Sequence, residues 1–396
     1  MLTMERKEAA EMRILILSSQ AFSLLHFRID MMKAFLTEGH EVYAAAPDQE
    51  AHWTKDLHAH GVSYHPILID RTGKNPFKDI RSFLSILSVI KTVSPQVVFC
   101  YQAKTVIYGL IASTVSRVPY RYALIAGLGS VFRNTDQSIR AVFVKYILTV
   151  QYRFALQFAK KVYFQNKDDA GEFIDNAIVK RNRVEYMNGS GVNLENFPKT
   201  MLPEENRFLF VGRLIMDKGI LEYLEAARIV RRQVPESVFD VVGYYDTNPT
   251  AISPQLLKPY FDEGIAFFHG QQEDVYPFIA RCRFFVLPSY HEGTPKSILE
   301  ALAVGRPVLT TDAPGCRDTV ESGINGYVVP PQNAKALAEK MLYLIEHPTV
   351  SLRMAEASYR KACEKYDVRF VNKQAIQSME LQRKIYEPVN KKSSKK

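Results

Sequence analysis

Residues 284–312 read FFVLPSYHEGTPKSILEALAVGRPVLTTD: an apolar run, a polar loop, a helical stretch and a second apolar run. Thr294 can cap a helix through its hydroxyl, and Pro295 suits the first helical position, where no N–H bond is lost. Gly305 suits the left-handed residue that ends a helix, and Arg306-Pro307 opens the next run. Because apolar runs separated by helices are typical of parallel sheets covered on both faces, we predict a strand, helix, strand unit.

The same alternation fills the rest of the chain in two series. Apolar runs such as MRILILSS, EVYAAAP and VVFCYQ alternate with amphipathic segments in the first half, and RFLFVGR, FDVVGYY and FFVLPS do so in the second. We therefore predict an α/β fold of two Rossmann-like, doubly wound parallel-sheet domains that face each other across a cleft. Ligands of such domains bind at the carboxyl ends of the strands.

The length of 396 residues favours two domains. The segment NGSGVNLENFPKT at 188–200 is rich in Gly, Asn and Ser and closes with Pro, as is typical of a connection. We place the N-terminal domain at residues 12–199 and the C-terminal domain at 200–365. Residues 366–396 are predicted to form a helix that packs back toward the N-terminal domain, followed by a basic tail.

Composition and missing motifs exclude several classes. The cysteines Cys100, Cys282, Cys316 and Cys363 stand alone, which favours a reducing intracellular compartment over disulfides or a zinc site. The first eleven residues lack the apolar core of a signal peptide. No strand is followed by G-x-G-x-x-G and no G-x-x-x-x-G-K-[ST] is present, so a dehydrogenase or a P-loop NTPase is disfavoured. Nucleotide-sugar enzymes, periplasmic-type binding proteins and some epimerases remain compatible.

The net charge of +9 indicates a polyanionic partner, which could be a nucleotide, a nucleic acid or an anionic membrane. The segment FVGRLIMDKG at 210–219 places Gly212 and Arg213 at the end of a strand and Lys218 near the start of the next helix. Two cations at the ligand edge of a sheet suit a diphosphate, since Arg offers a planar fork and Lys a point charge. The alternative interpretation is a glycine turn with two solvated cations.

The predicted helix between the two apolar runs of residues 284–312 is associated with two carboxylates. Glu292 precedes its N-terminus, and Glu300 lies about one and a half turns inside it. The free N–H groups of Lys296 and Ser297 could face a phosphate while Glu292 accepts hydrogen bonds from a polyol. Alternatively, Glu292 only compensates the helix dipole, which is worth about 0.3–1 kcal/mol.

The ordered set GRLIMDKG, FHGQQEDV, FVLPSYHEGTPKSILEALAVGRPVLTTDAPGCRDTVESGINGYVVP and NGSGVNLENF resembles the retaining glycosyltransferases of the glycogen-synthase-like group, which have the GT-B architecture. In the first half, YQAKTVIYGLIASTV, GLG at 127–129 and FQNKDD are similar to bacterial transferases that build lipid-linked glycans. The N-acetylgalactosaminyl and galactosyl transferases of surface polysaccharide and protein-glycan assembly are the most similar.

The resemblance implies a role for each matching position. Arg213 and Lys218 would hold the donor diphosphate, Glu292 would bind the donor sugar, and these three form the expected catalytic set. Glu300 would bind the ribose hydroxyls. Other donor-binding residues, mostly through main chain, would be Gly212, Gly243, Gly270, Gly293, Thr294, Pro295, Lys296 and Ser297. Candidates for the sugar-acceptor site are His26, Arg28, Gly127 and Gly129; the first two could instead be an ordinary helix-face pair.

The first domain departs from the family pattern in two places. The loop SSQAFSLLHFR stands where many relatives have a glycine-rich turn, and AGLGS stands where many place a His. No histidine of that domain is therefore expected to be catalytic. The resemblance implies that the acceptor hydroxyl attacks from the face that the phosphate leaves, with retention of configuration and a phosphate oxygen as base.

The implied reaction moves a hexose or N-acetylhexosamine, such as GalNAc or Gal, from a UDP-sugar to a polyprenyl-diphosphate-linked saccharide in bacterial polysaccharide or glycoprotein glycan synthesis. No cofactor is expected and no metal either, because a D-x-D run is absent. The alternatives are a nucleotide-sugar epimerase of the same architecture and a basic nucleic-acid-binding module, for which no motif is present. The expected partners are the UDP-sugar, the lipid-linked saccharide and an anionic membrane surface, with no nucleic acid.

Residues 133–161 read RNTDQSIRAVFVKYILTVQYRFALQFAKK, with six cations against one acid among aromatic and aliphatic residues. Such a segment is either a helix packed on the first domain with a solvated basic face or an interfacial helix on an anionic membrane. The second interpretation predicts a cytoplasmic enzyme that is peripheral on the inner face of the cell membrane.

Overall fold

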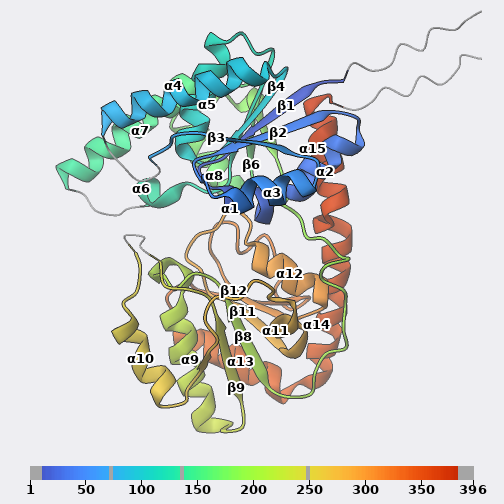
Figure 1. Ribbon diagram of the computed structural model, residues 1–396. Coiled ribbons are helices and arrows are strands. Elements are labelled where there is room, and N and C mark those ends of the chain that lie inside the picture. Colours follow the sequence, from blue (N-terminus) through green and yellow to red (C-terminus); the bar gives the residue numbers. More distant parts are fainter. Residues whose placement is uncertain (1–10, 71–74, 134–137, 247–249, 382–396) are drawn as a thin grey trace, which may run out of the picture.

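The computed structural model describes residues 11–70, 75–133, 138–246 and 250–381. Two stacked domains each contain one sheet in which every strand pair is parallel (Figure 1), so the predicted fold class is confirmed. The strands of the N-terminal sheet are β1 (Arg13–Leu17), β2 (Glu41–Ala46), β3 (Ser63–Pro66), β4 (Val97–Tyr101), β5 (Tyr120–Ile125), β6 (Lys161–Phe164) and β7 (Val184–Tyr186). Those of the C-terminal sheet are β8 (Arg207–Val211), β9 (Val238–Val242), β10 (Phe267–Phe268), β11 (Phe284–Leu287), β12 (Val308–Thr311) and β13 (Gly326–Val329).

The two sheets share one topology. The N-terminal order is β3-β2-β1-β4-β5-β6-β7 and the C-terminal order is β10-β9-β8-β11-β12-β13. In both, the strand order reverses beside the first strand, between β1 and β4 and between β8 and β11. Ligands of doubly wound sheets bind at this reversal, outside the carboxyl ends of the strands. The topology therefore predicts one site edge in each domain.

Helices cover both faces of each sheet. The helices of the N-terminal half are α1 (Ala21–Phe27), α2 (Ile29–Thr37), α3 (Ala51–Ala59), α4 (Pro76–Val93), α5 (Ala103–Val115), α6 (Gly129–Arg133), α7 (Ile139–Leu156) and α8 (Lys167–Asp175), with the short turn η1 (Arg181–Arg183). The others are η2 (Met216–Lys218), α9 (Ile220–Gln233), α10 (Pro254–Asp262), α11 (Tyr276–Arg281), α12 (Lys296–Val304), α13 (Ala334–Glu346), α14 (Pro348–Lys361), η3 (Ala362–Tyr366) and α15 (Val368–Met379).

The alternation of side chains along β1 divides the N-terminal core in two. Leu15 and Leu17 pack in a cluster with residues of α5 and α7, while Ile14 and Ile16 pack on the other face with residues of α2 and α15. All four are fully buried. A strand buried on both faces must be apolar at every position, which is why the run RILIL lacks the polar alternation of a half-exposed strand.

The chain passes between the domains twice, and the two passages lie side by side. In the first, Val192 donates its N–H to the carbonyl of Tyr366 (2.8 Å) and accepts from the N–H of Val368 (3.0 Å) in the second. A Cβ on Gly191 would lie 2.7 Å from the Cα of Val368, so this position requires glycine. The second passage continues into α15.

Helix α15 packs on the N-terminal domain, against α2, and forms the end of the red column in Figure 1. The hydroxyl of Tyr122 donates to the carbonyl of Met379 (2.7 Å), and the hydroxyls of Tyr163 and Ser378 lie 2.6 Å apart. The last helix of the described chain therefore belongs to the packing of the first domain. The predicted basic tail at 382–396 and residues 1–10 lie outside the described residues.

Candidate donor-substrate site

The two motifs of the second domain meet where its strand order reverses. Strands β8 and β11 are hydrogen-bonded neighbours. After β8 the chain passes Arg213 and the turn η2 into α9; after β11 it passes through residues 288–295, here called the β11–α12 loop, into α12. Because parallel strands end at one edge, Arg213, Lys218 and Glu292 are brought together there, as the sequence predicted.

Three predicted glycines lie at the ends of adjacent strands of this sheet. The N–H of Gly212 donates to the carbonyl of Val242 (3.0 Å), and the N–H of Gly243 donates to the carbonyl of Gly270 (2.9 Å). A Cβ on Gly243 would overlap with the Gly212 carbonyl oxygen. At these three positions the backbone carries no side chain, which allows a ligand to approach the main chain there.

Lys218 and Glu292 form the central ion pair of the site. The Lys218 Nζ donates to Glu292 Oε1, and the two side chains are only 18% and 14% exposed. Burial by itself raises the pKa of Glu292, but the Lys218 ammonium and, more weakly, the Arg213 guanidinium bring it below its usual value. The carboxylate is thus ionised at neutral pH and can only accept hydrogen bonds.

Neighbouring contacts hold this pair in place. Arg213 Nη1 donates to Asp246 Oδ2 (2.7 Å). Tyr290 donates its N–H to the carbonyl of Asp217 (2.8 Å) and its hydroxyl to Glu222 Oε1 (2.6 Å). These two hydrogen bonds of Tyr290 therefore connect the β11–α12 loop to η2 and α9.

The predicted start of α12 is wrong by one residue, and its cap is wrong. The helix begins at Lys296, Pro295 occupies the cap position, and no side chain caps it. The Thr294 hydroxyl instead donates to the carbonyl of Gln165 in the other domain (3.1 Å) and makes no capping bond to α12. The first N–H groups of a helix have no partner within it, so those of Lys296 and Ser297 can receive a phosphate. The predicted end is confirmed: Gly305 is left-handed, with φ of 80°.

Glu300 and Lys296 face each other one turn apart on α12. Glu300 is 4% exposed, and burial raises its pKa to about 7, although Lys296 Nζ lies 4.0 Å from its Oε1. Burial also lowers the pKa of Lys296, whose Nζ donates to the carbonyl of His26 in the N-terminal domain. Sequence reasoning expected only the backbone of Lys296 to act, and no local pattern indicated this contact between domains.

If Glu300 has the ribose-binding role that the resemblance implies, we expect the affinity for a UDP-sugar to rise with pH, because an ionised carboxylate would accept hydrogen bonds from two ribose hydroxyls. With a pKa of about 7, the ionised fraction grows roughly tenfold between about pH 6 and about pH 8. Titration calorimetry with UDP-GalNAc tests this, since a diphosphate diester does not titrate there. Glu300→Gln should bind more weakly and without this pH dependence; a parallel pH dependence in that variant would contradict the assignment.

The raised pKa of Glu300 also makes the folded state less stable as the pH rises, whereas substrate affinity is expected to increase. The folded-state pKa of Glu300 exceeds its ordinary value of 4.5. The favourable contribution of the protonated form is therefore fully present below about pH 4.5 and is lost as the pH rises through about 7. The site thus trades folding stability for an ionised carboxylate at neutral pH.

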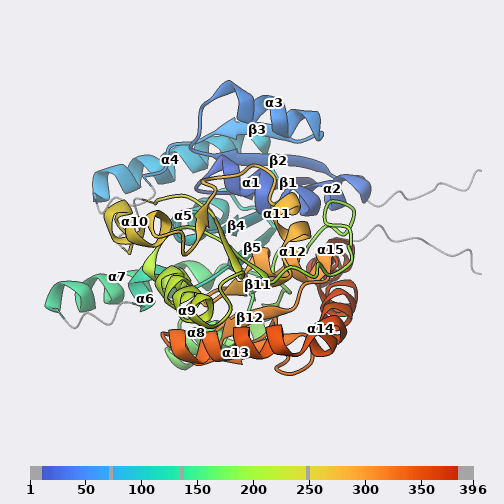
Figure 2. The ribbon, with the colours of Figure 1, turned by 90° about the horizontal axis from the view of Figure 1, so that it is seen from below.

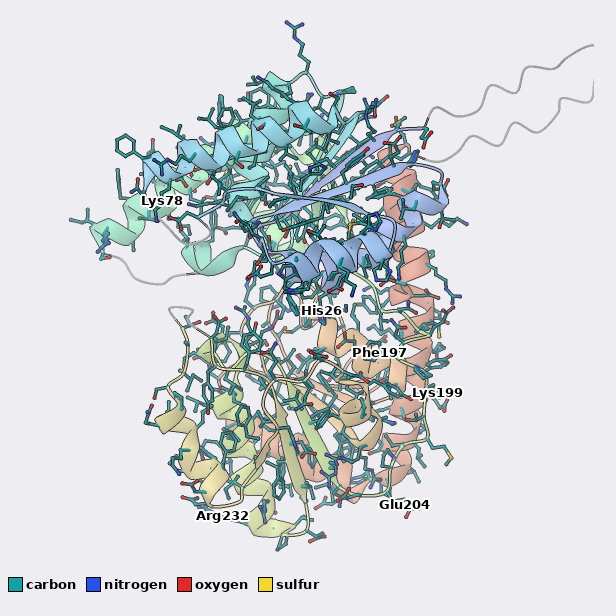
Figure 3. All side chains as sticks on the ribbon, in the orientation of Figure 1. His26, Lys78, Phe197, Lys199, Glu204 and Arg232 are labelled. Atoms are coloured by element: carbon teal, nitrogen blue, oxygen red, sulfur yellow. The ribbon has the colours of Figure 1, made fainter. Side chains whose placement is uncertain are left out.

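The predicted sugar-acceptor residues all lie on the N-terminal domain, and two of them, His26 and Gly127, lie against residues 293–296 of the other domain. His26, at the end of α1, lies at the boundary between the domains (Figure 3). Arg28 joins α1 to α2, is buried, and stacks on the Tyr101 ring at 5.0 Å. A Cβ on Gly127 would lie 3.7 Å from the backbone nitrogen of Gly293, so Gly127 reaches the donor side. Gly129 begins α6.

No site residue was predicted in the segment of the N-terminal domain that contacts the β11–α12 loop. Gln165, Asn166 and Asp169, from the end of β6 and the start of α8, contact the β11–α12 loop. An Asn shortly before two acids, after an apolar strand, indicates a capped helix that begins at the carboxyl edge of the sheet, where ligands bind. That signal was present in FQNKDD, but it gave no reason to expect a partner in the other domain.

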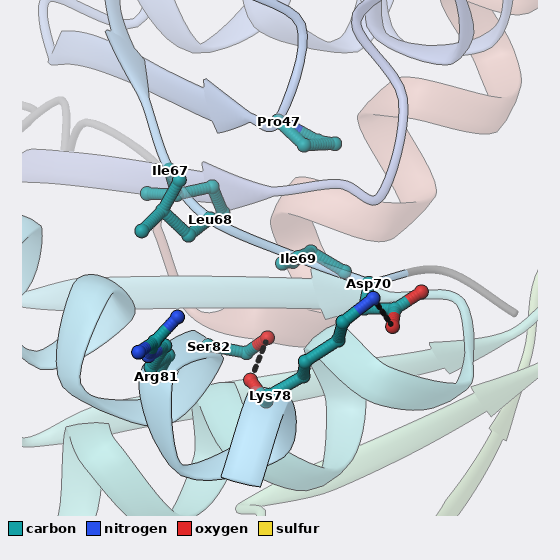
Figure 4. Close-up of a pocket in the computed structure, with 8 residues that line it drawn as sticks. All are labelled: Pro47, Ile67, Leu68, Ile69, Asp70, Lys78, Arg81 and Ser82. Carbon is teal, nitrogen blue, oxygen red and sulfur yellow. Dashed lines mark hydrogen bonds and ion pairs between the residues drawn. The ribbon is translucent and has the colours of Figure 1, made fainter. Parts of the chain in front are cut away.

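A separate pocket of about 360 Å³ lies in the N-terminal domain, between the end of β3 and α4 (Figure 4). Lys78 and Asp70 form an ion pair there (3.2 Å), and the Ser82 hydroxyl donates to the Lys78 carbonyl (3.0 Å). Lys78 is largely exposed, and such pairs contribute little. This pocket does not belong to the donor site. Within the described ranges, no cluster of three His, Cys, Asp or Glu residues could hold a metal, and the four cysteines are free.

Comparisons with known proteins agree with this geometry. The model of the group 1 glycosyl transferases matches residues 205–347, and a glycosyl transferase 4-like model matches residues 13–166. The N,N'-diacetylbacillosaminyl-diphospho-undecaprenol alpha-1,3-N-acetylgalactosaminyltransferase of Campylobacter jejuni is 30% identical over 370 residues, which cover 90% of this chain and 95% of that protein. The UDP-Gal:alpha-D-GlcNAc-diphosphoundecaprenol alpha-1,3-galactosyltransferase of Escherichia coli is 25% identical over 64% of this chain and 67% of its own length.

Among solved structures, Anabaena Alr3699/HepE in complex with UDP superimposes with a TM-score of 0.75. The match covers 94% of this chain and 100% of that one, at 17% identity. At this identity the likeness shows the shared fold of two facing Rossmann-like domains.

Proposed function

This chain belongs to the group 1 glycosyltransferases, and from that membership we propose that it moves a hexose or N-acetylhexosamine, such as GalNAc or Gal, from a UDP-sugar to a polyprenyl-diphosphate-linked saccharide. The observation that carries the proposal is the buried Lys218–Glu292 pair beside Arg213, at the strand reversal of the second domain. The relatives named above act on diphosphoundecaprenol-linked sugars, which supports the same class of sugar acceptor here.

In the proposed mechanism the protein positions two substrates and stabilises a leaving diphosphate. The negative charge that develops on the leaving diphosphate is stabilised by Arg213, Lys218 and the N-terminus of α12. Glu292 accepts hydrogen bonds from the donor sugar, and Glu300 from the ribose. The acceptor hydroxyl attacks from the face that the diphosphate leaves, and a phosphate oxygen takes its proton, so the configuration is retained.

A panel of UDP-sugars tests this function directly. Each is incubated with a lipid-diphosphate-linked acceptor such as N,N'-diacetylbacillosaminyl-diphospho-undecaprenol, and the product is identified by mass spectrometry and by the anomeric proton in NMR. A retained α linkage from one UDP-sugar is the expected result. Interconversion of the UDP-sugar without transfer would instead identify an epimerase, and an inverted linkage would contradict the mechanism.

We expect no metal requirement, because the diphosphate charge is met by Arg213, Lys218 and helix N–H groups rather than by a cation. Activity after exhaustive EDTA treatment and gel filtration should equal that of the untreated enzyme. An activity that disappears and returns with added Mg²⁺ or Mn²⁺ would show that a cation completes the site.

We further propose that α7 docks the enzyme on the inner face of the cytoplasmic membrane. Helix α7 extends sideways from the N-terminal domain in both views (Figures 1 and 2). Its exposed apolar side chains are Ile139, Val142, Phe143, Tyr146, Ile147, Val150 and Phe154. Arg140 is exposed among them, whereas Lys145 pairs with Glu172 (3.8 Å) and Arg153 donates to the carbonyl of Asn176 (2.7 Å). Arg133 and Asp136 of the predicted segment are not among the described side chains.

An exposed apolar stripe with cations is typical of an interfacial helix. Among the helices that the structure describes, none combines the length and the apolar character needed to cross a bilayer. Attachment through α7 would place the cleft near lipid-linked acceptors without a spanning segment.

Phe143→Asp should weaken binding to vesicles that contain phosphatidylglycerol by about tenfold or more, since burying one such side chain contributes roughly 1.5–3 kcal/mol. Co-sedimentation at low salt measures this. Leu352→Asp on α14 is the matched control, because Leu352 and Phe143 are similarly exposed, at 55% and 60%. If the two variants sediment alike, or the wild type stays in solution, α7 is not the docking element.

A further inference from the structure

The side chain of Asn166 makes contacts in both domains at once. Its Oδ1 accepts the N–H of Asp169 (2.7 Å) and so caps α8. Its Nδ2 donates to the carbonyl oxygens of Glu292 (3.0 Å) and Gly293 (3.2 Å) in the β11–α12 loop. The opposite orientation of the amide is excluded, because it would place the Nδ2 group against the N–H of Asp169 and Oδ1 against the two carbonyl oxygens. Asn166 is 3% exposed, so water cannot replace these bonds.

Adjacent residues reinforce the same contact. Gln165 accepts the N–H of Thr294 at its Oε1 (3.2 Å) and the Thr294 hydroxyl at its carbonyl (3.1 Å). His291 Nε2 lies 2.8 Å from Oδ1 of Asp169, a fully buried carboxylate. Each of the residues from His291 to Thr294 thus contacts this one segment of the N-terminal domain or lies against it.

The backbone of Glu292 is fixed on two sides by these bonds. Its N–H donates to the carbonyl of Pro314 (3.0 Å) within the C-terminal domain, while its carbonyl accepts from Asn166. The first bond is present whether or not the domains meet, but the second requires that they do. Lys218 engages the Glu292 side chain within the C-terminal domain, whereas the carbonyl of Glu292 is held by the other domain. The final orientation of Glu292 therefore depends on both domains.

We propose that Asn166 is a positioning residue, which sets the sugar-binding carboxylate of one domain through contacts that exist only when the other domain is docked. The inference rests on the function proposed for Glu292. It means that a UDP-sugar can bind to the C-terminal domain alone, whereas Glu292 takes its working orientation only in the closed arrangement. Donor chemistry is then restricted to the state in which the acceptor-binding domain is in place.

Asn166→Asp separates the two roles of this side chain. The carboxylate still caps α8, since Asp is as good a cap as Asn. It has no N–H to donate, and it places an anionic oxygen against two carbonyl oxygens. We expect kcat for transfer from UDP-GalNAc to fall on the order of 10²-fold, because displacing a contact group by about 1 Å costs that much. The Kd for UDP should stay within about threefold, because the substitution lies in the other domain.

Asn333→Asp is the matched control. Asn333 caps α13 by accepting the N–H of Ala336 (2.9 Å) and is exposed. It should behave as the wild type. Asn166→Ser keeps an oxygen that can cap α8, adds no charge, and removes the amide N–H groups that contact the other domain. It replaces Asn166→Asp in the experiment if the latter does not fold. A kcat within about twofold of wild type in either folded Asn166 variant, or a loss of UDP affinity as large as the loss of kcat, would overturn the inference.

Hydrogen exchange provides a readout that needs no activity. The N–H of Thr294 is protected by Gln165, and that of Glu292 by Pro314. In Asn166→Asp, a peptide covering residues 290–297 should exchange faster at Thr294, with unchanged exchange in α13; unchanged protection would refute the inference. If the wild type transfers no sugar from any UDP-sugar, the proposed function fails, and the exchange result still decides whether Asn166 holds the loop.

Discussion

Replacing Lys218 by alanine should lower the rate of sugar transfer by on the order of 10²- to 10³-fold, the usual cost of removing one donor that stabilises developing charge. In the proposed mechanism Lys218 contributes twice, because its ammonium would stabilise the departing diphosphate and it also donates to Glu292. Steady-state kinetics with UDP-GalNAc would measure the loss. Turnover near that of the wild type would contradict the proposed mechanism.

The same substitution should also cost stability, because it leaves a buried Glu292 without its main counter-charge. Breaking a buried pair typically costs on the order of 3 kcal/mol. Adding Glu292→Gln removes the unpaired charge, so the double variant should recover much of the melting temperature but none of the activity. Lys258→Ala, which breaks the exposed pair with Asp262, is the control and should change neither quantity.

Gly293→Ala should be nearly as damaging, for a steric reason. A Cβ at this position would overlap with the carbonyl oxygen of Ala126 and with Gln165 Oε1, both in the N-terminal domain. The domains would have to separate, and we expect a loss of kcat on the order of 10²-fold. Because the overlap lies outside the C-terminal domain, the Kd for UDP should change little.

Gly171→Ala is the control for this variant. A Cβ on Gly171, within α8, would meet no atom within 4 Å, so the change should be neutral or stabilise by about 0.5–1 kcal/mol. If Gly293→Ala keeps full activity, the closed contact between residues 126 and 293 is not part of the working enzyme. If it loses UDP affinity in parallel with kcat, the damage lies within the donor site instead.

Features determined by near neighbours in sequence were predictable. Gly305 ends α12 because only the local backbone decides where a left-handed residue is tolerated. The doubly wound fold followed from continuous apolar runs, since a strand buried on both faces leaves that pattern in the sequence. The meeting of Arg213, Lys218 and Glu292 followed in turn, because parallel strands end at one edge.

Features that depend on the other domain were not predictable. Thr294 has the residue type of a helix cap, but its hydroxyl is bound by Gln165, 129 residues earlier in the chain. The side chain of Lys296 reaches the carbonyl of His26, 270 residues earlier. Local propensity contains no information on such partners, so the sequence indicated which residues lie at the cleft but not how they are engaged.

The paired passages near Val192 and Val368 restrict how the two domains can move. A single flexible connection would let them slide, twist and separate, but two hydrogen-bonded segments lying side by side act as a short stiff band. Sliding one passage past the other would break the bonds of Val192 and press Gly191 into Val368. Bending across the band would preserve both the bonds and the space at Gly191. We therefore expect opening and closing to be close to a single rotation, which would return the loop at Glu292 to the same partners at each closure.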